Sequence, residues 1–374
     1  MKILMFVSVY FPSTIYGGPA TVAKMQAQEL VRRGHEVTII TTGVLSRKPF
    51  KQMENSTKND NGVTIRYFKV SNKSSKFSYL YSKEMVSWLK KNVALFDVCH
   101  IHYGREINPI IVAKIALKNK LPYVIQTHGM LNSSSVSKKI IDGMFVKKQL
   151  QDARYCLVLQ EYEKERINSI ETKSKTLTFP NGVYVNEQKG WSINTLKESN
   201  ILFLARLHPR KKVLNFVEMA KLLNDKNGSN KFSFRVVGPD GGELENAKSL
   251  ARKLKVSNIK FIGEVENSKT LEEYLNASVY VLPSINEPFP MSVIESLKLG
   301  VPTIVTDSIH NKEILKSYDS VYISDGSPAS LCNAVLDITT NPTLAEKLSS
   351  NGKKIVEEKL NINKLINKLV EIYS

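Results

Sequence analysis

Two glutamates, Glu287 and Glu295, lie eight positions apart in the stretch NEPFPMSVIES (286–296). Glu287 stands among prolines, which are excluded from helix interiors, so we expect it on a loop. Glu295 follows in an apolar-periodic run that ends at Gly300, so we expect it in the first turns of a helix. Because Ser292 and Glu295 match S-x-x-E, Glu295 can also be explained as a capping-box residue. Glu287 has no such structural explanation.

A second candidate stretch, ARLHPRKKV (205–213), follows an apolar run and leads into a helix. Arg206 and Lys211 flank its proline. Two fixed cations at a helix start can bind a diphosphate and stabilise the negative charge on a leaving group. The alternative is a solvated basic face, which is how we interpret Arg210 and Lys212.

Glycines form two further loops, Gly17-Gly18 between a strand and a helix and VVGPDGGELE (236–245) after a later strand. Backbone N–H groups exposed by glycine at a helix N-terminus suit a phosphate or a sugar hydroxyl. A tight turn that needs glycine explains them equally well. The first loop is not G-x-G-x-x-G, which argues against a dinucleotide site.

The histidines offer one candidate, His128 in QTHG, at the carboxyl end of a predicted strand. A hydrogen-bonded loop histidine is the alternative. His100 and His102 lie on one predicted strand, and we expect them to face opposite sides of it. The sequence contains no H-E-x-x-H, G-x-S-x-G or Asp-x-Asp, so zinc hydrolysis, serine hydrolysis and a divalent metal for a nucleotide are not indicated.

Alternating apolar runs and amphipathic stretches must position these residues. In the first half we predict strands at 2–10, 35–42, 97–103, 122–129 and 154–160 and helices at 19–34 and 107–120. In the second half we predict strands at 200–207, 232–238, 259–265, 279–284 and 302–307, a helix at 212–225, and two helices in 340–374. This order predicts two Rossmann-like, doubly wound α/β domains, and 374 residues suit two domains. We expect the ligands in a cleft between them.

Charge is distributed unevenly along the chain. Residues 1–150 hold 23 Lys and Arg against 8 Asp and Glu, whereas residues 151–374 hold 30 against 27. Such an excess favours an anionic partner, either nucleic acid or a membrane surface, although a generally lysine-rich proteome also explains it. The basic stretches 46–51, 69–83 and 137–150 interleave lysine with apolar residues, as interfacial segments do. No RNA-binding or zinc-finger pattern accompanies them.

Cellular location is indicated only indirectly. The three cysteines are widely spaced and fit buried thiols in a reducing cytoplasm. The N-terminal apolar run is short and is interpreted as a buried strand, not as a signal peptide. No apolar run approaches the roughly 18 residues that span a bilayer.

Five motifs in order carry a resemblance: Gly-Gly at 17–18, THG at 127–129, PNGV at 180–183, ARL…K at 205–211 and E-x7-E at 287–295. Together they resemble the retaining GT-B glycosyltransferases of family 4 over nearly the whole chain. The resemblance implies an acceptor-binding domain at 1–188 and a nucleotide-sugar-binding domain at 189–355. It also implies that the helix at 356–374 crosses back to the first domain.

The resemblance also implies the roles of individual residues. Glu287 would contact the donor sugar and His128 would reach it, while Arg206 and Lys211 would bind the diphosphate in place of a metal. Glu295 would hold the ribose hydroxyls of the nucleotide. The implied catalytic residues are therefore Glu287, His128, Arg206 and Lys211, and the implied donor-binding residues are Gly17, Gly18, Arg206, Lys211, Gly238, Val265, Phe289, Pro290, Met291 and Glu295. Neither a metal nor a cofactor is implied, because the nucleotide-diphosphate sugar is a substrate.

The resulting hypothesis is a retaining, metal-independent hexosyltransferase that uses a UDP- or GDP-linked sugar. We expect a lipid-linked glycan acceptor in cell-surface polysaccharide synthesis, and a cytoplasmic protein peripherally bound to the inner face of the cell membrane. A soluble small-molecule acceptor is the main alternative. A nucleotide-sugar epimerase and a basic nucleic-acid-binding protein are more distant ones.

Overall fold

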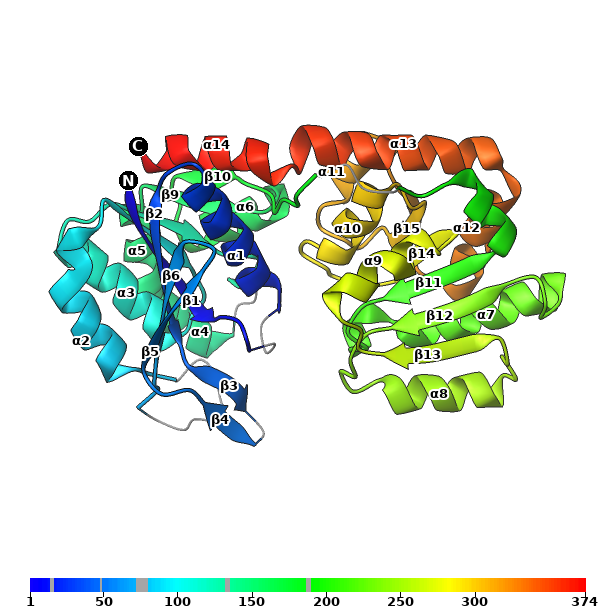
Figure 1. Ribbon diagram of the computed structural model, residues 1–374, viewed down its shortest axis with the longest axis horizontal. Helices are drawn as coiled ribbons and strands as arrows, with labels where there is room; N and C mark the ends of the chain where they lie inside the picture. Colours follow the sequence, from blue (N-terminus) through cyan, green and yellow to red (C-terminus); the bar gives the residue numbers. More distant parts are fainter. Residues whose placement is uncertain (14–16, 48, 72–79, 132–134, 186–189) are drawn as a thin grey trace. The chain divides into compact units, whose positions relative to one another are not determined.

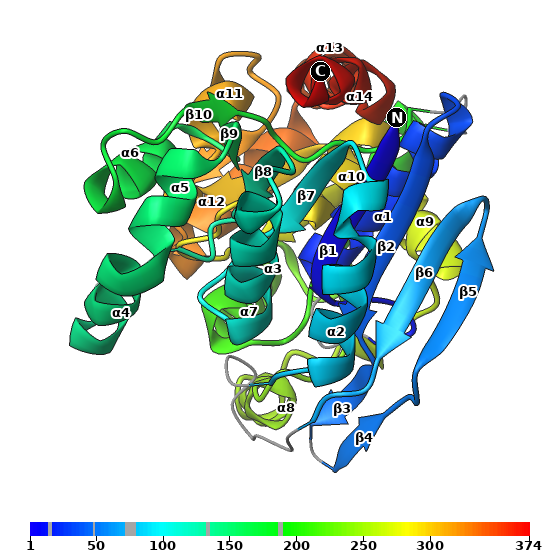
Figure 2. The same cartoon turned by 90° about the vertical axis from the view of Figure 1, so that its left-hand side faces the viewer.

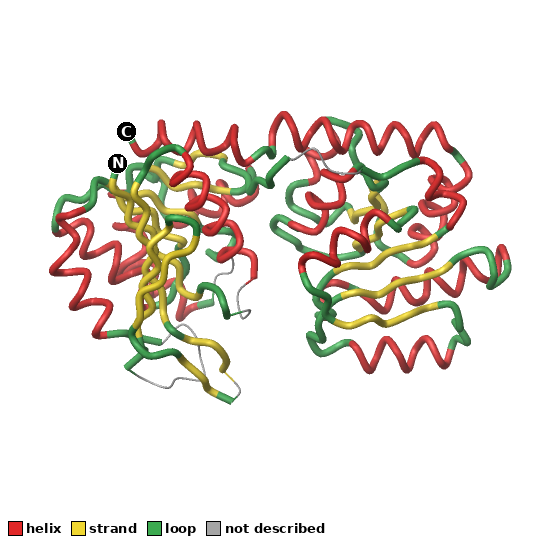
Figure 3. The backbone as a smooth tube through the Cα atoms, viewed as in Figure 1, coloured by secondary structure: helices red, strands yellow, loops and turns green. Residues whose placement is uncertain are grey.

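The computed structural model describes residues 1–13, 17–47, 49–71, 80–131, 135–185 and 190–374. The chain divides into two compact units, Met1–Asn181 with Ile362–Ser374, and Gly182–Asn361. These units divide the chain between 181 and 182 and between 361 and 362, whereas the resemblance implied domains at 1–188 and 189–355 and a final helix at 356–374. Figure 1 labels most elements of both units, and Figure 3 distinguishes their helices from their strands.

The first unit is built on an eight-stranded sheet with the order β10-β9-β8-β7-β1-β2-β6-β5. Its strands are β1 (Lys2–Val9), β2 (Glu36–Thr42), β5 (Ser56–Asp60), β6 (Val63–Phe68), β7 (Val98–His102), β8 (Tyr123–Gln126), β9 (Tyr155–Val158) and β10 (Thr176–Thr178). Only β5 pairs antiparallel, at the edge next to β6. The continuous apolar run of β1 is explained by its central place between β2 and β7, where the sheet is covered on both faces. A small separate sheet joins β3 (Val44–Arg47) to β4 (Phe50–Gln52).

Helices cover both faces of this sheet. They are α1 (Gly17–Arg32), α2 (Lys83–Asn92), α3 (Ile107–Lys118), α4 (Val136–Ile141), the π-helical turn η3 (Asp142–Val146), α5 (Lys147–Asp152), α6 (Glu161–Ile170) and α14 (Ile362–Tyr373), with a 3₁₀ turn η2 (Val93–Leu95). Figure 2 shows α2 and α3 in front of the strands, and α3 packs on β1 and β7. On β1 and β2 lies α1, against which the C-terminal α14 packs. Arg33 of the α1 end donates to the Asn363 carbonyl at 2.6 Å, which ties α14 to the first unit.

The second unit has a six-stranded sheet with the order β13-β12-β11-β14-β15-β16, parallel throughout. Its strands are β11 (Asn200–Leu204), β12 (Ser233–Val237), β13 (Ile259–Gly263), β14 (Val279–Leu282), β15 (Thr303–Thr306) and β16 (Tyr322–Ser324). Its helices are α7 (Val213–Asn227), α8 (Leu244–Lys253), α9 (Asn267–Leu275), α10 (Met291–Leu299), α11 (Lys312–Lys316), α12 (Pro328–Thr340) and α13 (Pro342–Lys359), with 3₁₀ turns η4 (Ile193–Glu198) and η5 (Pro209–Lys211). Helix α7 packs with α8 and α12, and α10 packs with α9 and α13. The predicted α/β class with parallel sheets is confirmed.

Each sheet reverses its strand order beside its first strand. In the first unit, β1 lies between β2 and β7, and in the second, β11 lies between β12 and β14. Loops leave such a reversal point in opposite directions, which opens a crevice at the carboxyl ends of the two strands. The loops after β1, β7, β11 and β14 are therefore where a ligand is expected. Across the described ranges, the helices are too short or too polar for any of them to cross a membrane.

Candidate active site

The carboxyl edge of the second sheet collects most of the predicted residues. Arg206 and Lys211 follow β11, Gly238 follows β12 and Val265 follows β13. The loop after β14 carries Glu287 and leads into α10. These four strands are consecutive in the sheet, and β11 and β14 flank the reversal point. The folding of one sheet thus gathers residues that are up to 81 positions apart in the sequence.

An ion cluster bridges the loops that follow β11 and β14. Lys211 Nζ lies 2.7 Å from Glu287 Oε2, and Arg210 Nη2 lies 3.5 Å from Glu287 Oε1. Glu287 is only 7% exposed, so its charge needs these partners. Arg210 is exposed, as its interpretation as a solvated residue requires, and its guanidinium also contacts this carboxylate. Lys212 is half-buried in a left-handed conformation at the start of α7.

Backbone hydrogen bonds fix the loop that carries Glu287. The Ile285 N–H donates to the Arg210 carbonyl at 2.9 Å, which joins the two loops directly. The His310 N–H donates to the Glu287 carbonyl at 2.9 Å. Asn286 takes a left-handed conformation (φ 51°), and asparagine is one of the few residue types that adopt this conformation readily. The carboxylate is thus held in place by main-chain contacts on both sides of it.

Glu295 lies in the second turn of α10, and the structure excludes the capping-box explanation. The N-cap of α10 is Pro290, and no side chain caps the helix. Ser292 lies inside the helix, where its hydroxyl accepts a hydrogen bond from Tyr280 at 2.8 Å. Burial raises the pKa of Glu295 to about 6, against the opposing effects of Lys298 and of a hydrogen bond with Tyr274. A half-buried carboxylate with no capping role is available for a ligand.

The start of α10 provides the remaining predicted donor contacts. Phe289 is buried, and Met291, which opens the helix, is half-buried. Pro290 has no N–H, so only its neighbours can donate from the backbone at this point. Val265 is half-buried in the loop between β13 and α9, and Arg206 is exposed after β11.

Gly238 has a packing reason to be glycine. Its φ is +138°, and a Cβ at this position would lie 2.1 Å from the Ala205 carbonyl oxygen. Its N–H donates to the Gly263 carbonyl at 2.8 Å, so this donor is already used. The close approach of the loops after β11 and β12 accounts for this residue without a ligand.

In the first unit, the glycine loop opens helix α1 behind β1. Gly17 is the first helical residue, and a Cβ added at Gly18 would meet no heavy atom within 4 Å. The space in front of this helix N-terminus is therefore open at Gly18. Residues 14–16 lie outside the described residues.

His128 belongs to a row of three histidines in the first unit. Its Nε2 lies 2.6 Å from Nδ1 of His102, and the rings of His100 and His102 stack with centroids 4.8 Å apart. The prediction that His100 and His102 face opposite sides was wrong, because side chains two positions apart on a strand lie on the same face. At the far end of the row, His100 Nδ1 lies 2.6 Å from the hydroxyl of Tyr373 in α14.

These histidines are neutral at neutral pH. Burial and, to a lesser extent, the neighbouring His100 lower the pKa of His128 to about 3. The pKa of His102 is also lowered by burial and then by both neighbours. The backbone of His128 is strained, with a φ of 50°. Because its ring is uncharged, the side chain interacts with a ligand by donating or accepting hydrogen bonds.

A buried glutamate that we did not predict, Glu163 of α6, anchors the His128 loop. Its Oε1 accepts from the Thr127 hydroxyl and from the Gly129 N–H, and its Oε2 accepts from the Leu159 N–H at 2.7 Å. Burial raises the pKa of Glu163, although these donors oppose the shift. Nothing in its local sequence distinguishes it from a solvent-facing helical glutamate, since its partners lie in loops after β8 and β9.

Comparison with known proteins places the chain in a family. A family model described as glycosyl transferases group 1 matches residues 186–355, and one described as Glycosyltransferase Family 4 matches residues 16–187. An uncharacterized glycosyltransferase of Methanocaldococcus jannaschii is 25% identical over 401 residues, covering 100% of this chain and 98% of that protein. The UDP-Gal:alpha-D-GlcNAc-diphosphoundecaprenol alpha-1,3-galactosyltransferase of Escherichia coli is 28% identical over 299 residues, 74% of this chain and 75% of that protein.

Among solved structures, Anabaena HepE in complex with UDP matches with a TM-score of 0.77 at 12% identity, over 99% of both chains. This likeness shows the fold, which is GT-B. Because the two family models together match residues 16–355, the chain belongs to family 4 of the glycosyltransferases and transfers a sugar from a nucleotide sugar.

Proposed function

We propose that this glycosyltransferase acts with retention at the anomeric carbon, without a metal, on a lipid-linked acceptor at the inner face of the cell membrane. The observation that carries the proposal is the ion cluster of Lys211, Arg210 and Glu287 at the reversal point of the second sheet. Preorganised charges at a ligand crevice are what the departure of a nucleotide diphosphate requires.

Lys211 and Arg206 are the proposed partners of the diphosphate. A lysine ammonium has three N–H donors, and Glu287 takes one of them. The others can bind phosphate oxygens, so Lys211 can link the carboxylate to the leaving group. Arg206 is exposed and follows β11 directly, within the same loop. Together these cations do the work that a metal ion does in other phosphate-transfer sites.

In the proposed reaction, the bond between the anomeric carbon and the diphosphate oxygen breaks, and its electron pair stays on the diphosphate. The acceptor hydroxyl forms the new bond on the face that the diphosphate leaves, and its proton passes to a phosphate oxygen. Glu287 contacts the donor sugar and Glu295 the ribose hydroxyls, while the backbone of Phe289 and Met291 donates to sugar hydroxyls. His128, being neutral, is a hydrogen-bonding partner for the sugar. Gly18 leaves room for the acceptor or a phosphate.

The acceptor proposal rests on the charge of residues 1–150 and on one relative. This half of the chain has 23 basic against 8 acidic residues, which favours an anionic surface. The E. coli relative is named for an acceptor with diphosphoundecaprenol, a lipid diphosphate. The donor is UDP- or GDP-linked, and the sugar and its linkage are open to direct screening.

The decisive experiment compares Glu287→Gln with Glu264→Gln, which changes an exposed carboxylate on the loop after β13. Hydrolysis of each nucleotide sugar in the absence of acceptor is followed by mass spectrometry, and nucleotide affinity by calorimetry. Glu287→Gln should nearly abolish turnover while nucleotide affinity changes little, and Glu264→Gln should match wild type. Ordinary turnover in Glu287→Gln would refute the role of this carboxylate.

Stereochemistry and location have their own tests. NMR of the fresh product should show the anomeric configuration of the donor, and the opposite configuration would exclude retention. Sedimentation with liposomes should show binding that rises with anionic lipid and falls with salt. Replacing Lys73, Lys76, Lys138 and Lys139 of the basic stretches by glutamate should weaken this binding. Of these four lysines, Lys138 and Lys139 are described by the structure, and Lys73 and Lys76 lie outside the described residues. Equal recovery in the supernatant with neutral and anionic vesicles would favour a soluble acceptor instead.

A further inference from the structure

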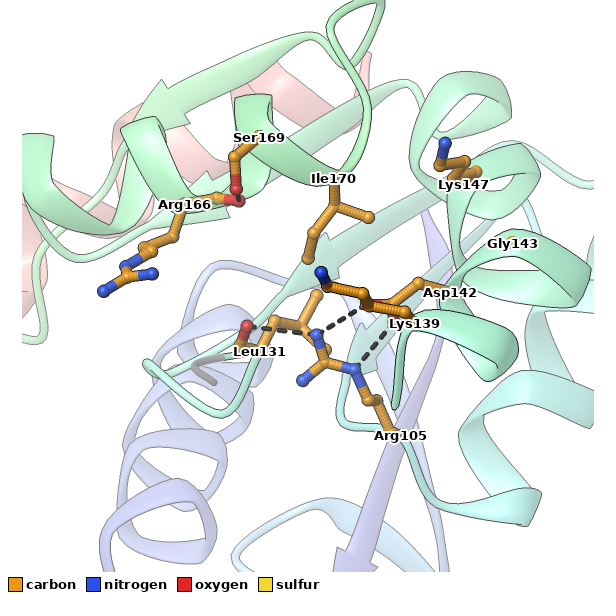
Figure 4. Close-up of a pocket in the computed structure, with 9 residues that line it drawn as sticks. All are labelled: Arg105, Leu131, Lys139, Asp142, Gly143, Lys147, Arg166, Ser169 and Ile170. Atoms are coloured by element: carbon orange, nitrogen blue, oxygen red, sulfur yellow. Dashed lines mark hydrogen bonds and ion pairs between the residues drawn. The ribbon is translucent and has the colours of Figure 1, made fainter. Parts of the chain in front are cut away.

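A cavity of about 310 Å³ opens in the first unit, between the segment α4–η3–α5 and helix α6. Figure 4 shows the residues that line it: Arg105, Leu131, Lys139, Asp142, Gly143, Lys147, Arg166, Ser169 and Ile170. Four of these nine residues are basic and one is acidic. The volume is at the small end of the range for ligand pockets, so a compact anionic group fits its size and charge.

One side of the cavity is a fixed ion pair. Arg105 Nε lies 2.7 Å from Asp142 Oδ1 and Arg105 Nη2 lies 2.9 Å from Asp142 Oδ2, a two-pronged contact. Arg105 Nη2 also donates to the Leu131 carbonyl at 3.2 Å, and the arginine side chain is only 8% exposed. This pair consumes the only carboxylate of the cavity. It therefore gives the cavity a rigid wall and leaves the charge of the other cations uncompensated.

Three cations remain on the cavity lining. Within the part of the chain that the structure describes, Lys139, Lys147 and Arg166 have no carboxylate within ion-pair distance, and all three are exposed. Figure 4 shows Lys139 beside the Arg105–Asp142 pair, with Arg166 and Lys147 at opposite margins. Arg166 is steadied by the ring and the hydroxyl of Tyr162, the latter at 2.9 Å. The lining thus carries three positive charges without a carboxylate partner, and a group with two or more negative charges, such as a phosphate or diphosphate, would compensate them best.

An apolar stripe runs beside this cavity. Val136, Ile140 and Met144 recur every four residues along α4 and η3 and are 76%, 57% and 66% exposed. The same spacing places Lys139 and Lys147 on the neighbouring side of the segment, against the cavity. Single exposed apolar side chains are common, but apolar side chains that line up in one exposed stripe mark an interaction surface. Because the stripe adjoins the cations, the partner combines a phosphate with an apolar body.

We propose that this cavity binds the phosphorylated headgroup of a membrane lipid. In the bound state, Lys139 contacts the phosphate while Lys147 and Arg166 attract it from the margins of the cavity. Val136, Ile140 and Met144 enter the interface between headgroups and acyl chains. The inference rests on the proposed function, which places the protein at a membrane. It adds a site specific for a lipid phosphate to the general attraction between the basic first unit and an anionic membrane. A free phosphate would leave the apolar stripe without a partner.

The test measures binding of the full chain to three kinds of vesicle. Phosphatidylcholine vesicles are doped with phosphatidic acid, which carries a terminal phosphate, or with phosphatidylserine at a matched surface charge, or with neither. Wild type should bind the phosphatidic acid vesicles about tenfold more tightly than the phosphatidylserine vesicles. Replacing Lys139 and Lys147 together by alanine should weaken binding to phosphatidic acid roughly thirtyfold, the equivalent of about 1 kcal/mol per lysine, and should remove the preference.

The matched control replaces Lys90 and Lys91 of α2, exposed lysines of the same unit, which removes the same charge away from the cavity. This control should keep the preference for phosphatidic acid. Ile140→Gln should weaken binding to both anionic vesicles, whereas Leu95→Gln, at a residue 62% exposed elsewhere in the unit, should not. No preference in wild type, or equal loss of preference in both lysine pairs, would overturn the proposal.

Two further arms separate the possible causes. Calorimetry with inorganic diphosphate should show weak binding at most, and tight binding unaffected by Ile140→Gln would identify a site for free phosphate instead. Sedimentation velocity distinguishes a lipid from a second copy of the chain on the apolar stripe, since dimers that Ile140→Gln dissociates would contradict the lipid. Donor hydrolysis should stay at the wild-type level in the Lys139/Lys147 variant. Failure of the Glu287→Gln experiment would therefore refute the proposed chemistry and leave the vesicle result standing.

Discussion

Glu295→Gln should stabilise the protein while it weakens nucleotide binding. Burial raises the pKa of Glu295 from its ordinary value of 4.5 to about 6 in the folded protein. The folded protein thus binds a proton on this carboxyl more tightly than the unfolded chain does. Stability is therefore lost as pH rises from 4.5 to 6, and above pH 6 the ionised carboxylate costs about 2 kcal/mol, at 1.36 kcal/mol for each pH unit.

Glutamine is neutral at every pH and has nearly the same shape, so the variant avoids this cost. At pH 7.5 its free energy of unfolding should exceed that of wild type by up to about 2 kcal/mol. For a unit of the size of Gly182–Asn361, this corresponds to roughly 4–8 °C in melting temperature. At pH 4 the two proteins should melt together, because the wild-type carboxyl is then protonated in both states.

The same change should reduce affinity for the nucleotide, since ribose hydroxyls donate better to a carboxylate than to an amide. Wild-type affinity should fall below pH 6 and the affinity of the variant should not depend on pH. Glu218→Gln, at an exposed position of α7, is the control for surface charge. Differential scanning calorimetry and nucleotide titration at pH 4, 6 and 7.5 decide the matter. A variant that is less stable than wild type at every pH and binds nucleotide normally would show that Glu295 is a structural residue.

Three further predictions concern both units. Lys211→Ala and Arg206→Ala should each lower turnover by about a hundredfold or more, and the wild-type rate should survive EDTA; strict dependence on magnesium or manganese would contradict this. Glu163→Gln should lower both the melting temperature and the activity, because the glutamine amide cannot accept hydrogen bonds from all three donors of Glu163. A buried donor left without a partner costs about 1–3 kcal/mol of stability. The control Glu165→Gln, on the exposed side of α6, should lower neither. Because burial lowers the pKa of His128 to about 3, this residue does not titrate between pH 5 and 8. The pH profiles of the transfer rate of wild type and of His128→Gln should therefore have the same shape over this range.

The sequence predicted buried strands well and polar ones poorly. The apolar runs of β1 and β14 could be recognised because a parallel strand covered on both faces needs hydrophobic residues throughout. No element was predicted between residues 43 and 70, where β5 forms an edge hairpin with β6. Its strand STKND has no apolar alternation, since an edge strand in contact with water needs none. The Asn61-Gly62 turn, with φ values of 52° and 86°, was the available signal.

The sequence also indicated which residues are candidates but not what each one contacts. Glu287 stood out because a carboxylate among prolines has no helical role. Its partner Arg210 did not, because the contact depends on β11 and β14 being neighbours, and 74 residues separate these strands in the chain. Glu163 was missed for the same reason, since its three donors lie in loops that meet only when β8 and β9 pair.

The histidine row shows how one local error concealed a physical link. Had His100 and His102 been placed on one face, the sequence would have indicated a polar row inside a hydrophobic sheet, which needs a partner at each end. The structure supplies Tyr373 at one end and His128 at the other. Tyr373 lies in the helix that returns to the first unit after residue 361, so the chain terminus completes the row that supports the His128 loop. The return of α14 to the first unit therefore contributes to packing and also supports, through His100 and His102, the loop that carries His128.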